Sequence, residues 1–214
     1  MDIRLQKTNL GLRDNAILEA LALRVRLLSL GQITKVFFND NAKGAHRRMT
    51  QLAKSNFVKP VRILARTTPR QQQPIFVWEL TQPQPRFQAI VVQLRSRWLT
   101  APTRMTTVYL QGQATAKLFG AKAIGKLRHI FQASHDLGFA ETFLLFLATR
   151  PEDAKRWMKE DLPRKALGQI PDGLIVDSNR VPIRAIEYCG LYPAVRLKRF
   201  HIHCAKMRLP YELW

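Results

Sequence analysis

The sequence predicts a mixed α+β fold: a helical, strongly basic N-terminal part, then a C-terminal part in which helices alternate with strands. Between residues 14 and 58, apolar residues recur at helical spacing, whereas short apolar runs bounded by turn residues predict strands further along. Charge divides the chain in a similar way. Residues 1–132 hold 22 Lys and Arg against 5 Asp and Glu, and residues 133–214 hold 13 against 10.

The composition indicates a partner that carries negative charge. The 214 residues have a formal net charge of +20, and 46% of them are hydrophobic, enough for real cores. Nucleic acid is the commonest partner of such a basic chain. A membrane surface is the alternative, but the longest nearly apolar stretch, 139–148, is short and contains Glu141. We expect a cytoplasmic protein, because the first ten residues lack an apolar signal segment and Cys189 and Cys204 are too few for a disulfide framework.

Three helices are predicted first, over residues 14–30, 32–38 and 42–58. Asp14 is the expected N-cap of the first, and Gly31 ends it. The polar residues 39–41 form the turn before the third helix. That helix turns four small or apolar residues inward, Ala45, Met49, Leu52 and Ala53, and places polar and basic residues on its outer side, Lys43, His46, Arg47, Thr50 and Lys54.

Two extended stretches follow, residues 61–67 and 74–80, and they are expected to form a hairpin. Three helices and then a hairpin is the order of a winged helix-turn-helix, whose third helix enters the major groove of double-stranded DNA while the hairpin touches phosphate. The alternative is a small basic helical domain whose third helix serves packing alone. The predicted DNA contacts in this part are Lys43, Arg47, Arg48, Lys54, Arg66 and Arg70.

The middle of the chain is expected to connect two domains. A helix over residues 87–98 extends the basic face through Arg95 and Arg97, and a strand over 106–111 and a short helix over 114–120 follow. The predicted division is therefore a winged-helix domain (1–82), a connector (83–132) and a C-terminal domain (133–214).

The C-terminal part is expected to run helix, uncertain segment, strand, strand, helix, strand. Ser134 caps the first helix, and Pro151 follows its end. The remaining elements are a strand or short helix within 156–163, strands at 172–177 and 182–189, a helix at 191–207 and a strand at 211–214.

Two acids stand at the outer ends of the predicted hairpin, in the stretch IPDGLIVDSNRVPIRAIEYCG of residues 170–190. A two-residue turn at 179–180 gives opposed residues numbers that sum to 359, which places Asp172 across from Glu187. A turn at 178–179 shifts the pairing by two residues and keeps both acids on one face. Two carboxylates so close repel unless a proton or cation lies between them, and Mg²⁺ or Mn²⁺ suits such an oxygen site.

This Asp–strand–Glu arrangement, followed by a helix and a strand, resembles the PD-(D/E)XK restriction-endonuclease-like superfamily. Together with an N-terminal winged helix and the segments SHDLGFA, IPDGLIV, IEYCGLY, RLKRFHIHC and LPYELW, the chain resembles the replication-relaxation family of plasmids and other mobile elements. The resemblance implies an αβββαβ core and metal-dependent DNA nicking, with Asp172 and Glu187 as catalytic metal ligands. It also implies other mobilisation or replication proteins as partners.

One motif residue departs from that resemblance. Cutting members carry a lysine two residues after the glutamate, and this chain has Cys189 there. Lys198 or Arg196 on the following helix is a spatial substitute, and Glu141 a candidate accessory acid. The alternative is a DNA-binding regulator or relaxosome accessory protein that has kept the fold and lost catalysis.

Overall fold

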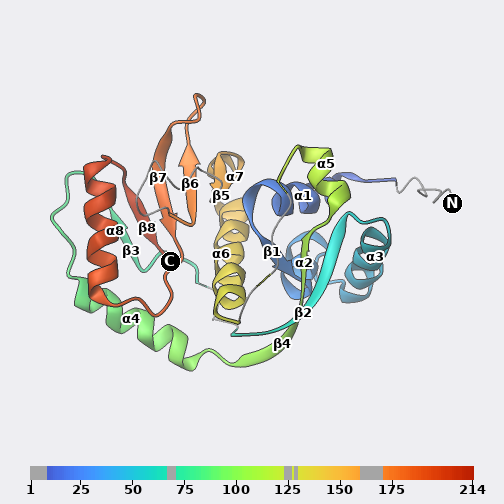
Figure 1. The fold of residues 1–214 in the computed structure, drawn as a ribbon, viewed down its shortest axis with the longest axis horizontal. Coiled ribbons are helices and arrows are strands. Elements are labelled where there is room, and N and C mark those ends of the chain that lie inside the picture. Colours follow the sequence, from blue (N-terminus) through green and yellow to red (C-terminus); the bar gives the residue numbers. More distant parts are fainter. Residues whose placement is uncertain (1–8, 67–70, 123–126, 128–129, 160–170) are drawn as a thin grey trace. The chain divides into compact units, whose positions relative to one another are not determined.

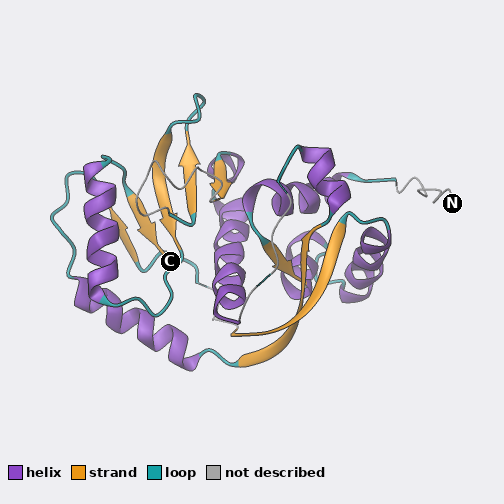
Figure 2. Cartoon of the chain, in the orientation of Figure 1, coloured by secondary structure: helices purple, strands orange, loops and turns teal. Residues whose placement is uncertain are grey.

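The computed structural model describes residues 9–66, 71–122, 127, 130–159 and 171–214 (Figure 1). Within these residues the protein is a mixed α+β protein with eight α-helices and two sheets, one of three antiparallel strands and one of five mixed strands (Figure 2). The predicted mixture of helices and strands is confirmed at this level. None of the described helices is both long and apolar enough to cross a membrane.

The chain forms two compact units, and each unit is built from two separate segments. The first unit comprises Met1–Ala65 and Arg104–Ala140, and the second comprises Arg66–Thr103 and Glu141–Trp214. The division predicted from the sequence was three consecutive segments. The backbone therefore passes from one unit to the other three times.

The first unit contains a three-stranded sheet and a set of short helices. In chain order its elements are α1 (Leu12–Glu19), the π-helical turn η1 (Ala20–Arg24), β1 (Leu27–Ser29), α2 (Leu30–Phe37), α3 (Ala42–Lys54), β2 (Val58–Arg66), β4 (Thr103–Gln111), α5 (Gln113–Phe119) and the first half of α6 (Ile130–Thr149). The sheet order is β1-β4-β2, so β4 is the central strand. The apolar side chains of Leu27, Ala65, Val108 and Leu110 are buried in a core that also includes Leu137 of α6.

The first helix ends earlier than predicted because its last residues form a strand. Helical structure stops at Arg24, and the buried Leu27 and Leu28 pair with Leu110 and Tyr109 of β4. Ser29 then caps α2 by accepting a hydrogen bond from the Gln32 backbone at 3.1 Å.

Asp14 is not the N-cap of α1. Gly11 occupies that position, and its N–H donates to Oδ2 of Asp14 at 3.0 Å. Asp14 is thus the third residue of the helix, where a carboxylate reaches back to the exposed N–H of the cap.

The predicted hairpin between residues 61–67 and 74–80 is wrong. Strand β2 lies beside β4, whereas β3 (Phe76–Trp78) belongs to the second unit and pairs with β8 (Tyr211–Leu213). The Trp78 ring is buried there and stacks on Tyr211 with ring centroids 5.5 Å apart. The three residues of β3 are all apolar, and such a short run can pair with any open sheet edge, so the local pattern did not reveal its partner.

The second unit is built around the five-stranded sheet. Its elements are β3, α4 (Phe87–Thr100), the second half of α6, α7 (Pro151–Lys155), β5 (Trp157–Lys159), β6 (Gly173–Val176), β7 (Pro182–Glu187), α8 (Ala194–Lys206) and β8. The strand order is β3-β8-β7-β6-β5, and β7 and β8 form the parallel pair. Strands β6, β7 and β8 and helix α8 lie within their predicted ranges, and β5 is a strand where a strand or a short helix was expected. Helix α6 begins at Ile130 and includes Ser134, its expected cap.

Helices cover both faces of this sheet (Figure 1). On one face α4 and α8 contribute to a core that contains Leu174, Ala185 and Tyr211 of the strands. On the other face Trp157 packs edge-on against Phe146 of α6, at 5.0 Å between ring centroids. Because side chains alternate along a strand, Asp172 and Glu187 share the face of Leu174 and Ala185, toward α8.

A close backbone approach in the first unit leads to a stability prediction. The N–H of Gly112 donates to the Phe57 carbonyl at 2.9 Å. An added Cβ at Gly112 would clash with the Asn56 carbonyl oxygen and lie 2.7 Å from the Phe57 carbonyl carbon. We expect Gly112→Ala to lower the free energy of unfolding by about 1–3 kcal/mol, measured by chemical denaturation.

The matched control is Gly31→Ala in α2. Its nearest neighbour would be Ser29 Oγ at 3.9 Å, and alanine favours a helix. Stability should stay the same or rise slightly. Equal effects at the two glycines would show that the close approach at Gly112 is unimportant.

Candidate functional site

Helix α3 has one buried face and one exposed basic face. Ala45, Met49 and Leu52 are completely buried. The residues predicted on the outer side are all exposed, namely Lys43, His46, Arg47, Thr50 and Lys54. The helix begins at Ala42, where the Asn41 side chain accepts a hydrogen bond from the Gly44 N–H at 2.8 Å. The described geometry therefore leaves Lys43, Arg47 and Lys54 accessible to a partner.

Arg48 differs from these neighbours because its guanidinium is engaged within the unit. Nε donates to Oδ1 of Asp14 at 3.0 Å, and Nη2 donates to Oδ2 at 2.7 Å. Nη2 also donates to the Asn9 carbonyl at 2.7 Å. This two-pronged ion pair joins α3 to α1, so Arg48 has a structural role that the sequence analysis did not foresee.

The same contacts set the pKa of Asp14. Burial by itself raises the pKa of a carboxyl, but here the hydrogen bonds from Arg48 and from the Gly11 N–H outweigh burial, and the pKa of Asp14 is lowered. The carboxylate is consequently ionised at neutral pH and fixes Arg48 in place.

Strands β2 and β4 add basic residues that the sequence analysis missed. Lys59 and Arg62 of β2 and Arg104 of β4 are exposed, and the two strands are neighbours in the sheet. The sequence pattern of residues 103–111 predicts a strand, but it points to these basic residues only once that strand, β4, is known to lie beside β2.

Two predicted DNA contacts follow at the end of β2. Arg66 donates from Nη1 to the Trp98 carbonyl at 2.9 Å, and Arg70 lies outside the described residues.

The prediction that Arg95 and Arg97 extend a basic surface is half wrong. Arg95 is exposed on α4, but Arg97 is only 8% exposed. Its Nη2 donates to the Cys189 carbonyl, Nη1 donates to Gln71 Oε1 at 2.8 Å, and burial lowers its pKa. Arg97 follows the buried Leu94 by three residues, so it lies on the inward face of α4 and cannot reach a ligand on the surface.

Of the two registers predicted for the hairpin, the structure has the one that places Asp172 across from Glu187. Gly173 pairs with Ile186 and Leu174 with Ala185, so the paired numbers sum to 359 and the next position matches Asp172 with Glu187. The Asp172 N–H donates to Glu187 Oε2 at 3.2 Å, and the Tyr188 N–H donates to Asp172 Oδ2 at 2.8 Å. A register irregularity between Ile175 and Val176 is confined to the turn end of the hairpin.

Glu187 is compensated by protein groups on both carboxylate oxygens. Its side chain is 4% exposed, and Oε1 accepts a hydrogen bond from the Tyr192 hydroxyl at 3.0 Å. Arg196 Nη2 donates to the same hydroxyl at 2.8 Å and lies 4.0 Å from Oε1. The guanidinium carbon of Arg196 is 3.5 Å from the centre of the Tyr192 ring. Burial, and then the charge of Glu187, raise the pKa of Tyr192, which stays a neutral donor.

The structure places the other predicted catalytic residues in different surroundings. Lys198 is exposed on α8, and Arg196 is the α8 cation beside Glu187. Glu141 is half-buried on α6, the helix whose Phe143 and Phe146 pack on the opposite sheet face. Cys189 is fully buried, and burial together with the charge of Glu187 raises its pKa well above the usual value. A neutral thiol therefore stands where the motif lysine is expected.

The described residues around Asp172 and Glu187 include a guanidinium, and this weighs against a divalent metal at the pair. Among the described residues, no group of three or more His, Cys, Asp and Glu side chains is placed to hold a metal ion. The fixed positive charge of Arg196 lies beside Glu187 Oε1, where it repels a second cation. The carboxylate pair is balanced by a guanidinium and by hydrogen bonds.

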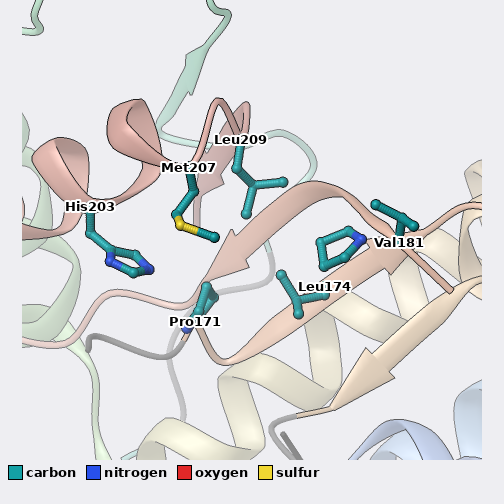
Figure 3. A pocket seen from close by; sticks show the side chains of 7 residues that line it. Pro171, Leu174, Val181, His203, Met207 and Leu209 are labelled. Carbon is teal, nitrogen blue, oxygen red and sulfur yellow. The ribbon is translucent and has the colours of Figure 1, made fainter. Parts of the chain in front are cut away.

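A small apolar pocket lies on the same face of the sheet as the carboxylate pair (Figure 3). Its volume is about 150 Å³, and it is lined by Pro171, Leu174, Val181, Pro182, His203, Met207 and Leu209. Burial and the charge of Lys206 lower the pKa of His203, so the imidazole is neutral at pH 7. Pro171 directly precedes Asp172, but the described lining residues include no carboxylate, and His203 is the one imidazole among them.

Another buried carboxylate, Glu212 of β8, was not singled out from the sequence. Its side chain is 4% exposed and lies on the sheet face opposite to that of Glu187. Arg150 Nη1 donates to Oε1 at 2.8 Å, and the Trp214 indole donates to Oε2 at 3.0 Å. Glu212 is an acid next to apolar residues in a predicted strand, as Glu187 is, so the same pattern could have identified it.

The chain was compared with known proteins at three levels. No protein-family model, no curated protein and no solved structure matches it significantly.

The Asp14–Arg48 pair leads to a prediction about acid stability. A carboxyl with a lowered folded-state pKa stabilises the fold above its unfolded pKa of about 3.9, and this contribution is lost as the pH falls through the folded pKa. Asp14→Asn should therefore reduce the free energy of unfolding near pH 7 by on the order of 1–2 kcal/mol. The difference from wild type should shrink below about pH 4 in denaturant titrations.

Glu152→Gln serves as the control, because Glu152 forms an exposed ion pair with Lys155. It should change stability little at any pH. A cost of Asp14→Asn that is constant from neutral to acid pH would contradict the assigned role of the charge.

Proposed function

We propose that the protein binds double-stranded DNA through a winged helix-turn-helix in the first unit. The observation that carries the proposal is the exposed basic face of α3, opposite a face that is completely buried. Helices α1, α2 and α3 and the neighbouring strands β2 and β4 have the order of that fold, with residues 67–102 between the two strands. In this assignment α3 enters the major groove, and Lys59, Arg62 and Arg104 contact phosphates.

The second unit supports a restriction-endonuclease-like fold in the same proposal. From α6 onward the elements run helix, three antiparallel strands, helix, and a strand parallel to the third, apart from the short helix α7. Helices cover both sheet faces, and the carboxylate pair is at the position that the family resemblance assigns to the motif acids. We assign the protein to the DNA-binding regulators or accessory proteins of plasmids and other mobile elements.

Metal-dependent nicking with Mg²⁺ or Mn²⁺ is the second candidate function. The register that places Asp172 opposite Glu187 favours it. The neutral, buried Cys189 and the guanidinium of Arg196 beside Glu187 weigh against it. The non-catalytic assignment therefore fits the described residues better.

The DNA-binding proposal predicts a steep salt dependence that α3 helps to determine. Each phosphate contact contributes a slope of roughly −0.9 to a plot of log affinity against log salt concentration. The double variant Lys43→Gln and Arg47→Gln should bind a short DNA duplex roughly tenfold or more weakly, with a slope shallower by about one to two. Fluorescence anisotropy over a range of salt concentrations measures both quantities.

Lys117→Gln is the matched control, since Lys117 is an exposed lysine on α5 of the same unit. It should have a much smaller effect. If the control lost as much affinity, α3 would have no special role in DNA binding. If the wild type did not bind DNA, or bound it independently of salt, the proposal would be overturned.

The non-catalytic assignment predicts the outcome of a nicking assay. Supercoiled plasmid incubated with wild type and Mg²⁺ or Mn²⁺ should stay supercoiled, and Asp172→Ala should behave identically. Metal-dependent conversion to open circles by wild type, lost in Asp172→Ala, would establish the nuclease instead.

A further inference from the structure

We infer that Arg196 is a phosphate-binding residue of the second unit, and that Tyr192 and Glu187 hold it in place. This inference rests on the proposed DNA binding and adds a contact outside the first unit. In it, the carboxylate that the family resemblance assigns to a metal ion positions a guanidinium instead.

The contacts of Arg196 fix its orientation while leaving it accessible. Its side chain is 51% exposed, its guanidinium lies over the Tyr192 ring, and Nη2 donates to the Tyr192 hydroxyl. In the part of the chain that the structure describes, Nη2 is the nitrogen of Arg196 that donates a hydrogen bond. The N–H groups of Nε and Nη1 remain for an incoming phosphate, and a planar guanidinium suits phosphate oxygens.

The chain of contacts leads from this exposed guanidinium to a buried anchor. Tyr192 accepts from Arg196 and donates to Glu187, and Glu187 Oε2 is held in turn by the Asp172 N–H. An arginine that is already oriented loses less conformational freedom on binding than one that swings freely. Because Tyr192 and the buried Glu187 hold Arg196, its guanidinium is suited to a phosphate contact of defined geometry rather than to nonspecific electrostatic attraction.

The surroundings on α8 are also favourable to an anion. Lys198 and Arg199 are exposed on the same helix, whereas Glu187 is 4% exposed. Asp172 is the opposing charge nearby; it is half-buried, and its Oδ2 accepts the Tyr188 N–H. An arriving phosphate thus meets the guanidinium ahead of the buried Glu187 carboxylate.

A purely structural ion pair between α8 and β7 is the competing explanation, and it predicts a different result. Arg196→Gln would then lower stability and leave DNA affinity unchanged. The two explanations separate when affinity and stability are measured on the same variants.

The experiment uses the full chain and a short DNA duplex, with affinity measured by anisotropy at several salt concentrations. Arg196→Gln should weaken binding about threefold to tenfold and make the salt slope shallower by about 0.9. Lys198→Gln, with the same charge change on the same helix, should have a clearly smaller effect. Tyr192→Phe removes only the orienting hydroxyl, so it should weaken binding severalfold without a change in net charge.

Each outcome decides one of the two proposals. Equal effects of Arg196→Gln and Lys198→Gln, or full affinity in both Arg196→Gln and Tyr192→Phe, overturn the inference while DNA binding by the first unit stands. Wild type that fails to bind the duplex overturns the proposed function, and the inference with it. Denaturation curves show whether a weaker variant is still folded.

Discussion

A carboxylate buried inside a protein needs donors or cations to replace the water it has lost, and the described part of the second unit supplies them to Glu187 and to Glu212. Glu187 is satisfied on the α8 face of the sheet by Tyr192, Arg196 and the Asp172 N–H. On the opposite face Glu212 is satisfied by Arg150 at the end of α6. Arg196 comes from α8 and Arg150 from the end of α6. Each ion pair therefore connects a helix on one face of the sheet to a strand of the sheet.

The parts of the fold that sequence reasoning recovered are those governed by neighbouring residues. The inward and outward faces of α3 follow from helical spacing, and the positions of β6 and β7 from short apolar runs separated by a turn. Strand parity then placed Asp172 and Glu187 on one face, and the position directly opposite was one of the two registers that a short hairpin allowed. That part of the candidate site was predictable, whereas its neutralisation by Arg196 depended on how α8 packs. Leu197, Phe200 and Cys204 turn inward, and this rotation leaves Arg196 beside the acid.

Arginine's usual exposure was a poor guide to location. Arg97 was assigned to a surface, but it is buried against the Cys189 carbonyl. Arg48, a predicted DNA contact, is paired with Asp14. The error in strand pairing has a different cause. The partner of β2 was chosen as the next strand in the sequence, although the true partner follows residues 67–102. Pairing over such a separation is decided by which apolar faces fit, and a local pattern carries no information about that.

The interleaving of the two units also constrains how the protein matures on the ribosome. Strand β2 is made early, but β4, which completes its sheet, emerges only after β3 and α4, and both of these wait for the C-terminal strand and α8. Domains usually fold one after another during synthesis, the N-terminal one first. Here the first unit cannot finish before residues 66–103 have left the ribosome, and β3 has no partner until residues 211–213 of β8 have been made. The nascent chain must therefore carry β3 as an unpaired strand while all the residues between β3 and β8 are synthesised.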